Sequence, residues 1–211
     1  MRPLSKTAVA MFFAKVVGIY ALLVIVWPAA HGCYARLFCA AGDAAFRSFG
    51  QLGRTDFTLL DPLPGDSDAR DFEIKLENIR TRVRPTFEPD RNTRKLGYLP
   101  TAFTAALVLA TPIPWRRRGW ALLWSTVLIS AFVGLQLGLH LLNAFSDPNH
   151  LNQFAFSPWM KALLVVALKV VAISPVTAYI APVFIWALVT FRREDWAALV
   201  TSAPGKQRAA Q

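Results

Sequence analysis

The chain has 211 residues, 55% of them hydrophobic and 17% charged, and its formal net charge at pH 7 is +10. A soluble domain is typically about a quarter charged, so this chain has too little polar surface for a purely aqueous fold. Much of the positive charge lies in short clusters beside apolar runs, as in cytoplasmic loops that face anionic lipid, and nucleic acid is therefore excluded as the expected partner.

The first apolar segment, residues 8–27, follows Arg2 and Lys6 and has the length of about 20 residues that crosses a bilayer core. Residues 29–31 would fit a signal-peptide cleavage site, but the segment is longer than the apolar core of a signal peptide. We interpret it as an uncleaved anchor that ends at Pro28. The alanine-rich stretch 31–49 is predicted either as an amphipathic helix at the outer interface or as a continuation of the first span.

Residues 50–95 are predicted to form a small extracytoplasmic β domain. Its clearest strand carries Phe72, Ile74 and Leu76, which alternate with charged residues in the period-two pattern of a half-buried strand. The phase of this pattern flips at Asn78, where we expect a bulge or a turn. Residues 55–60 can supply a second, antiparallel strand.

Three arginines, Arg80, Arg82 and Arg84, follow that strand at alternate positions. On one strand face they would be spaced by about 6.6 Å and would present a ladder to an anion or to a partner protein. The other interpretation is a solvated charged face balanced by Glu88 and Asp90.

Three further spans are predicted within residues 96–193. The second span, residues 96–114, is entered through Pro100, which suits the first turn of a helix. The third, residues 120–142, is uncharged and contains small residues that allow close helix packing. The fourth is placed at residues 171–191, because a lysine at the bilayer centre costs about 2.5–3.5 kcal/mol and the preceding residues 158–170 contain two.

Basic clusters fix the orientation. Residues 2–6, 116–118 and 192–193 are basic and fall on one side of a four-span chain, whereas residues 143–157 contain no Lys or Arg. The positive-inside rule then places both termini in the cytoplasm. We expect the membrane to be the inner membrane of a bacterium.

The expected fold class is therefore an all-α membrane bundle of four transmembrane helices with a small extracytoplasmic β cap. Its expected parts are the first transmembrane helix with its extension (1–49), the β domain (50–95), three further transmembrane helices (96–193) and a cytoplasmic tail (194–211).

Polar residues that carry chemistry are few. Cys33 and Cys39 lie six apart, a spacing that on one helix would not allow a disulfide, so two free structural thiols are expected. The histidines are too scattered for a metal framework, and no metal or other cofactor is expected. Gln136 and His140 lie one turn apart near the outer end of the third span. Such a pair either marks an intramembrane functional site or fixes helix packing by hydrogen bonds.

The stretch LVLATPIPWRRR at residues 107–118, followed at once by an uncharged span, resembles the small exosortases of the exosortase/archaeosortase group. These are bacterial membrane transpeptidase-like enzymes that process carboxyl-terminal sorting signals. The resemblance implies a catalytic Cys at the outer start of the preceding helix, an Arg in the next helix and a further Arg or His. Here the first position, residues 96–100, has no Cys, the second falls near Gln136, and neither His140 nor His150 lies in a matching motif.

We therefore expect a non-catalytic accessory or structural protein of the cell envelope, with the lipid bilayer and an envelope protein as partners and no catalytic residue. A membrane-embedded exosortase-like transpeptidase or protease with altered catalytic groups is the alternative, and a small transporter subunit is the third hypothesis.

Overall fold

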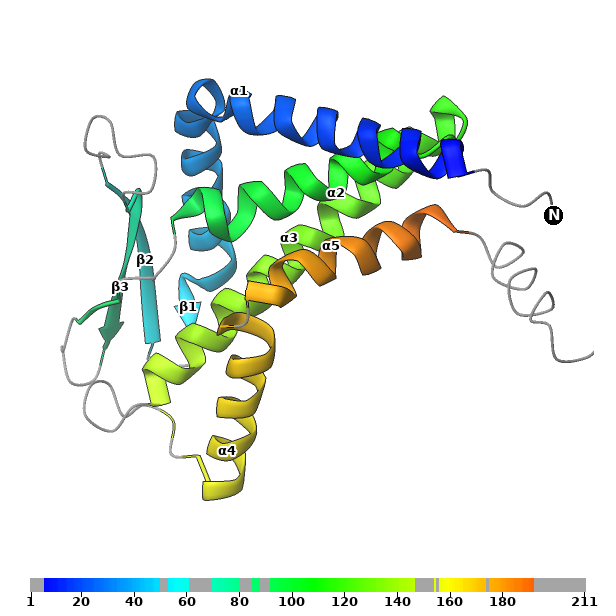
Figure 1. Cartoon of the computed structure of the whole chain (residues 1–211). Coiled ribbons are helices and arrows are strands. Elements are labelled where there is room, and N and C mark those ends of the chain that lie inside the picture. Colours follow the sequence, from blue (N-terminus) through cyan, green and yellow to red (C-terminus); the bar gives the residue numbers. More distant parts are fainter. Residues whose placement is uncertain are drawn as a thin grey trace, which may run out of the picture.

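The chain is mostly helical, with a small antiparallel sheet at one end of the helices (Figure 1). The computed structural model describes residues 6–49, 53–60, 70–79, 85–87, 92–146, 154, 156–173 and 175–191. The predictions for Arg80, Arg82, Arg84, His150 and the tail 194–211 fall outside the described residues.

The first helix, α1 (Lys6–Phe46), is 41 residues long and contains Pro28. The helix continues for a further 18 residues beyond Pro28 to Phe46, so the chain after Pro28 follows the second of the two predicted alternatives, a continuation of the first helix. Proline has no N–H group and its ring clashes with the preceding turn, so it bends a helix that is held on both sides. Figure 1 shows this bend, which turns the second half of α1 across the other helices and along the sheet.

The chain returns through η1 (Arg94–Tyr98), a short π-helix, and α2 (Leu99–Ala110), whose first turn contains Pro100 as predicted. The helix ends where Thr111 becomes extended before two prolines, so the predicted span at 96–114 is helical only as far as Ala110. After a tight turn, α3 (Trp115–Ser146) runs uninterrupted for 32 residues.

Two helices that meet at an angle follow α3. They are α4 (Pro158–Ala167) and α5 (Pro175–Thr190), joined by the π-helix η2 (Leu168–Ile173). Figure 1 shows α5 returning beside α3, whereas α4 points away from it. The long apolar region 158–191 therefore divides close to residue 171, where the fourth span was predicted to begin.

The sheet contains β1 (Ser48–Phe49), β2 (Gly53–Leu59), β3 (Phe72–Asn78) and β4 (Thr86–Phe87), in that order and antiparallel throughout. The alternation predicted for β3 is confirmed, because its apolar side chains are buried and Ile74 is 0% exposed. The strand ends at Asn78, where the sequence pattern changes phase.

An apolar core attaches this sheet to the helices. Cys39 from the second half of α1, Phe72 and Ile74 from β3, and Leu141 from α3 belong to one buried cluster. A separate cluster joins Val16 in the first half of α1 to α2. The sheet is thus packed directly on the helices and is not a freely linked domain.

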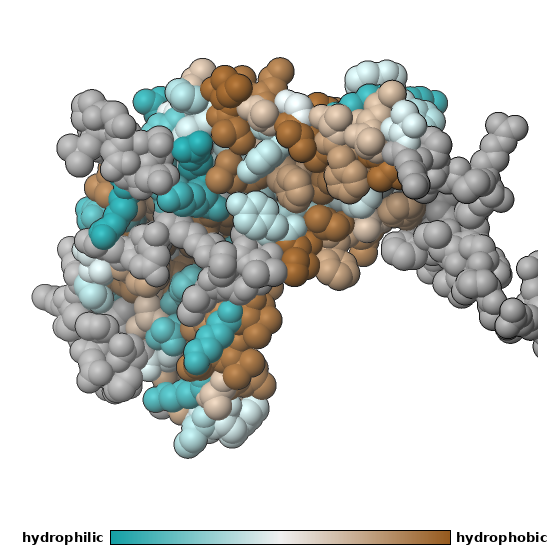
Figure 2. All heavy atoms as spheres, in the orientation of Figure 1, coloured by the Kyte–Doolittle hydropathy of each residue, from teal (hydrophilic) through white to brown (hydrophobic). Residues whose placement is uncertain are grey.

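Large apolar side chains cover the outer surfaces of the helices. Two of the described helices, α1 from Val9 and α3, are long and apolar enough to cross a membrane. Figure 2 shows apolar surface over the helices and more polar surface toward the sheet. The exposed side chains include Val17, Leu22, Ile25, Leu123, Val127, Leu135, Phe184 and Leu188.

Candidate functional site

Asp71 occupies the junction between the sheet, α1 and η1. It directly precedes β3 and is 2% exposed. A buried carboxylate requires hydrogen-bond donors, and Thr93 supplies two of them. Its backbone N–H donates to Asp71 Oδ1 at 2.9 Å, and its hydroxyl donates to Oδ2. His31 Nε2 donates to the same Oδ2 at 3.3 Å.

These contacts join three segments that are distant in sequence. His31 lies on α1 just beyond the Pro28 bend, and Thr93 leads into η1. The Asp71 carbonyl also accepts a hydrogen bond at 2.9 Å from the Leu60 N–H, which follows β2. Asp71 therefore fixes the bent helix, the sheet and the entry to α2 in one arrangement.

Aromatic rings surround the bend. The Trp27 ring lies 5.2 Å from the His31 ring and 4.5 Å from the Tyr98 ring. The Tyr98 hydroxyl donates to the Leu23 carbonyl at 2.7 Å, in the helical turn before Pro28. Bent helices open their backbone hydrogen bonds near the proline, and this hydroxyl adds a donor there.

The carboxylate orients the His31 imidazole, as in a catalytic pair, but the thiols are not placed beside it. Cys33 is two residues further along the helix and points about 200° away. Cys39 is eight residues further, about 12 Å along the axis. Burial, with smaller contributions from the Asp71 and Asp43 carboxylates, raises the pKa of Cys39 to about 11. This thiol is protonated at neutral pH and belongs to the core.

The predicted pair Gln136 and His140 enters two different environments. Gln136 is buried, and its Nε2 donates to the Val171 carbonyl at 2.7 Å. Val171 lies in η2, where the wide π-turn departs from regular helical hydrogen bonding. The half-buried His140 ring lies 6.1 Å from the ring of Phe87 in β4. This geometry supports the packing interpretation for Gln136 and does not join the two residues in one site.

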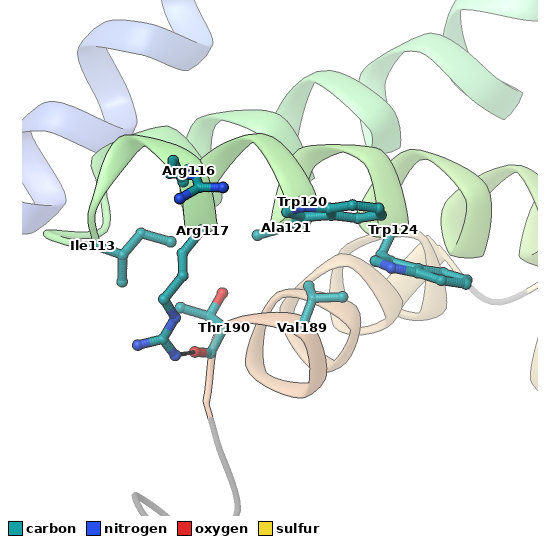
Figure 3. Close-up of a pocket in the computed structure, with 8 residues that line it drawn as sticks. All are labelled: Ile113, Arg116, Arg117, Trp120, Ala121, Trp124, Val189 and Thr190. Atoms are coloured by element: carbon teal, nitrogen blue, oxygen red, sulfur yellow. Dashed lines mark hydrogen bonds between the residues drawn. The ribbon is translucent and has the colours of Figure 1, made fainter.

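A second polar site lies at the opposite end of the helices from the sheet, between the beginning of α3 and the end of α5. A cavity of about 470 Å³ lies there, and Figure 3 shows the side chains that line it. Arg117 reaches across it, and its Nη2 donates to the Thr190 carbonyl at 3.3 Å. The cavity is lined by Ile113, Arg116, Arg117, Trp120, Ala121, Trp124, Val189 and Thr190.

Sequence reasoning missed both sites. It used the three consecutive arginines for topology and for the resemblance to exosortases, although Arg116, Trp120 and Trp124 recur at intervals of four and so share a helix face. Nothing local in the sequence linked Asp71 to Thr93, which lies 22 residues away.

Comparisons of the chain with models of protein families, with curated proteins and with solved structures found no match. Within the described part of the chain, no group of three or more His, Cys, Asp or Glu side chains is arranged to hold a metal ion. The site geometry is therefore the basis for any functional proposal.

Proposed function

We propose that this chain is a multi-pass protein of the bacterial inner membrane, a non-catalytic accessory or structural protein of the cell envelope related to the exosortases. In this proposal it crosses the bilayer four times, with both termini in the cytoplasm and residues 50–95 outside. The observation that carries the proposal is an exposed apolar surface that covers the helices, with the sheet at one end of this surface and the arginines at the other.

Exposed apolar groups are too numerous for a soluble monomer. Ile25 on α1 and Phe184 on α5 are 76% and 70% exposed, and α3 adds further exposed Leu, Val and Trp side chains. A soluble monomer rarely exposes a contiguous apolar patch larger than a few hundred Å². Lipid would cover these side chains, and the charged residues 116–118 would lie at the cytoplasmic surface.

Two of the four proposed crossings are short. The helix α5 has 16 residues, and α2 has 12 residues extended by the five of η1. At 1.5 Å per residue α5 is about 24 Å long, compared with a hydrocarbon core of about 30 Å. Local thinning of the bilayer accommodates such a mismatch at modest cost.

The positions that the exosortase resemblance would use for catalysis have structural roles here. Leu96 and Gly97, where the resemblance implies a Cys, are buried in η1. Gln136, near the implied Arg, is bonded to the backbone of η2. These contacts support a relative that has kept the architecture without the chemistry.

The outward face of the sheet offers a surface for an envelope partner. Arg54 and Asp56 on β2 are opposite Glu77 and Lys75 on β3, so the face alternates in charge. A mixed-charge face favours a specific orientation of a partner with the complementary pattern.

A photo-crosslinking experiment in the native host tests this function. A photoreactive amino acid at Asp56 should crosslink the full-length chain to a discrete envelope protein, and the cysteine-free Cys33→Ser, Cys39→Ser chain should give the same product. The same amino acid at Gly119, on the arginine end, is the matched control and should not give it. No discrete product at Asp56 would contradict the accessory role.

The His31–Asp71 contact is the one observation that favours the alternative, an exosortase-like enzyme with altered groups. That enzyme would need a thiol brought to His31 by a rearrangement of α1. A cysteine-free chain that inserts and folds normally but has lost its cellular function would support the enzyme and contradict the accessory role.

A further inference from the structure

We propose that the cavity between α3 and α5 binds the phosphate-bearing headgroup of an anionic phospholipid. The site rests on the membrane placement proposed above, which puts this cavity at the cytoplasmic surface of the bilayer. Four features of the described residues carry the inference: uncompensated positive charge, an unpaired buried hydroxyl, the polarity of the two helix ends and an exposed tryptophan wall.

Positive charge at the cavity has no acidic counterpart in the described structure. The described residues from Asn92 to Phe191 include no Asp or Glu. Arg116 is exposed and has no hydrogen-bonding or ionic partner among the described residues. Arg117 uses one nitrogen on the Thr190 carbonyl, and a guanidinium has further donors to offer.

Thr190 provides the second feature. The residue is 5% exposed, yet its Oγ1 is buried without a hydrogen-bond partner in the described structure. A buried hydroxyl without a partner is costly, and Thr190 lines the cavity, so the proposal assigns the missing bond to the bound phosphate. Figure 3 shows the Thr190 side chain beside Arg117, on the side of α5 that faces α3.

The helix ends favour an anion. The first N–H groups of α3 have no partners within the helix and carry partial positive charge. The carbonyls that end α5 carry partial negative charge, but Arg117 binds the carbonyl of Thr190 and offsets it. A phosphate in the cavity would therefore lie beside the two arginines of the first turn of α3 and near the positive end of that helix.

The tryptophans distinguish a lipid from a free phosphate. Trp120 and Trp124 are 64% and 53% exposed, and they form one wall of the cavity in Figure 3. A small inorganic ion would leave these indole rings uncovered. A phospholipid covers them with its glycerol and upper acyl chains, at the depth where Trp is enriched in membrane proteins.

Lipid retention by the full-length chain tests the site. The protein is purified in mild detergent, exchanged with phosphatidylglycerol or with phosphatidylcholine of the same chain length, and the bound lipid is counted by native mass spectrometry. Wild type should retain phosphatidylglycerol preferentially. The Arg116→Gln, Arg117→Gln variant should lose roughly tenfold or more of that retention. Thr190→Val, which keeps the charge, should lose severalfold.

The Lys161→Gln, Lys169→Gln variant removes the same charge from exposed positions outside the cavity and is the matched control. It should retain lipid as wild type does, and millimolar inorganic phosphate should not displace the lipid. Equal retention by the arginine variant, equal loss in the lysine variant, or displacement by phosphate would each overturn the site.

Two further outcomes are distinguishable. A chain ending at residue 193 should retain the same amount of phosphatidylglycerol as wild type. Higher retention by the truncated chain would show that Glu194 and Asp195 of the tail pair with the arginines in place of lipid, which would overturn the proposal. If the chain leaves the membrane without detergent, the membrane placement itself fails. If it needs detergent but shows no lipid selectivity, only the site fails.

Discussion

Replacing Asp71 with Ala should separate the sheet from the bent helix more effectively than any other single polar substitution near the bend. The carboxylate accepts two hydrogen bonds from Thr93 and one from His31. Thr93 is fully buried, so its N–H would be left without an acceptor and without water. His31 is partly exposed, and water can replace its lost partner.

The size of the effect follows from these contacts. A hydrogen bond to a charged group contributes about 1.5–3 kcal/mol, and an orphaned buried donor costs about 1–3 kcal/mol. Relief of the buried charge offsets part of this loss. We expect a net loss of about 3–5 kcal/mol, which corresponds to a fall in Tm of about 6–20 °C for a chain of this size. Asp71→Asn keeps one acceptor oxygen and should lose less.

The chain provides its own reporter for this measurement. In a Cys33→Ser background, Cys39 is the only thiol and is buried in the sheet core. A thiol-reactive fluorogenic dye added to detergent-solubilised protein therefore reports unfolding of that core during heating. The matched control is Asp56→Ala on the exposed face of β2, which should shift Tm by no more than about 2 °C. Equal shifts for the two variants would refute the role assigned to Asp71.

Three further outcomes follow from the same structure. At pH 8 the folded Cys33→Ser chain should react with maleimide at least about 100-fold more slowly than the Cys39→Ser chain, because the raised pKa of Cys39 keeps its thiol protonated. This protection, and the stability linked to the protonated thiol, should be lost as the pH rises through about 9 to 11. Equal rates at pH 8 would contradict the prediction. Ile74→Lys buries an unpaired charge and should cost a few kcal/mol of stability, seen as a lower dye-reported Tm. Lys75→Gln on the exposed face loses only the ion pair with Glu73 and should cost no more than about 1 kcal/mol, and equal sensitivity at the two positions would rule out the inward face assigned to β3. Gln136→Leu should cost about 0.6–2 kcal/mol through the lost bond to η2, seen as a lower Tm, and an unchanged Tm would show that this bond contributes nothing.

Local sequence patterns predicted the helices and strands better than the bends and connections between them. The alternation around Ile74 gave the strand and its buried face because one side of the sheet must pack on apolar groups. At Pro28 the sequence left open whether the chain forms a separate amphipathic helix or continues the first helix. A proline usually marks the end of a helix, but here packing against the sheet on one side and α2 on the other holds the helix through the bend.

The candidate sites depended on contacts between distant parts of the chain. Asp71 and Thr93 are 22 residues apart, and Arg117 and Thr190 are 73 apart. Neither pair shares a helix or strand periodicity that a sequence pattern could detect. Gln136 was recognised because a polar residue in an apolar span is visible in sequence, but its partner was a backbone carbonyl, which no sequence pattern shows.

The placement of the two ends of the molecule on opposite sides of a membrane is the central claim, and thiol labelling tests it most directly. In the cysteine-free chain, single cysteines are introduced at Asp56 on the sheet and at Gly119 on α3; both positions are exposed, and a Cβ at Gly119 meets no other atom. A membrane-impermeant maleimide applied to spheroplasts should label Asp56→Cys at once and Gly119→Cys only after the inner membrane is opened. Labelling of Gly119→Cys from outside, with Asp56→Cys protected, would contradict the account.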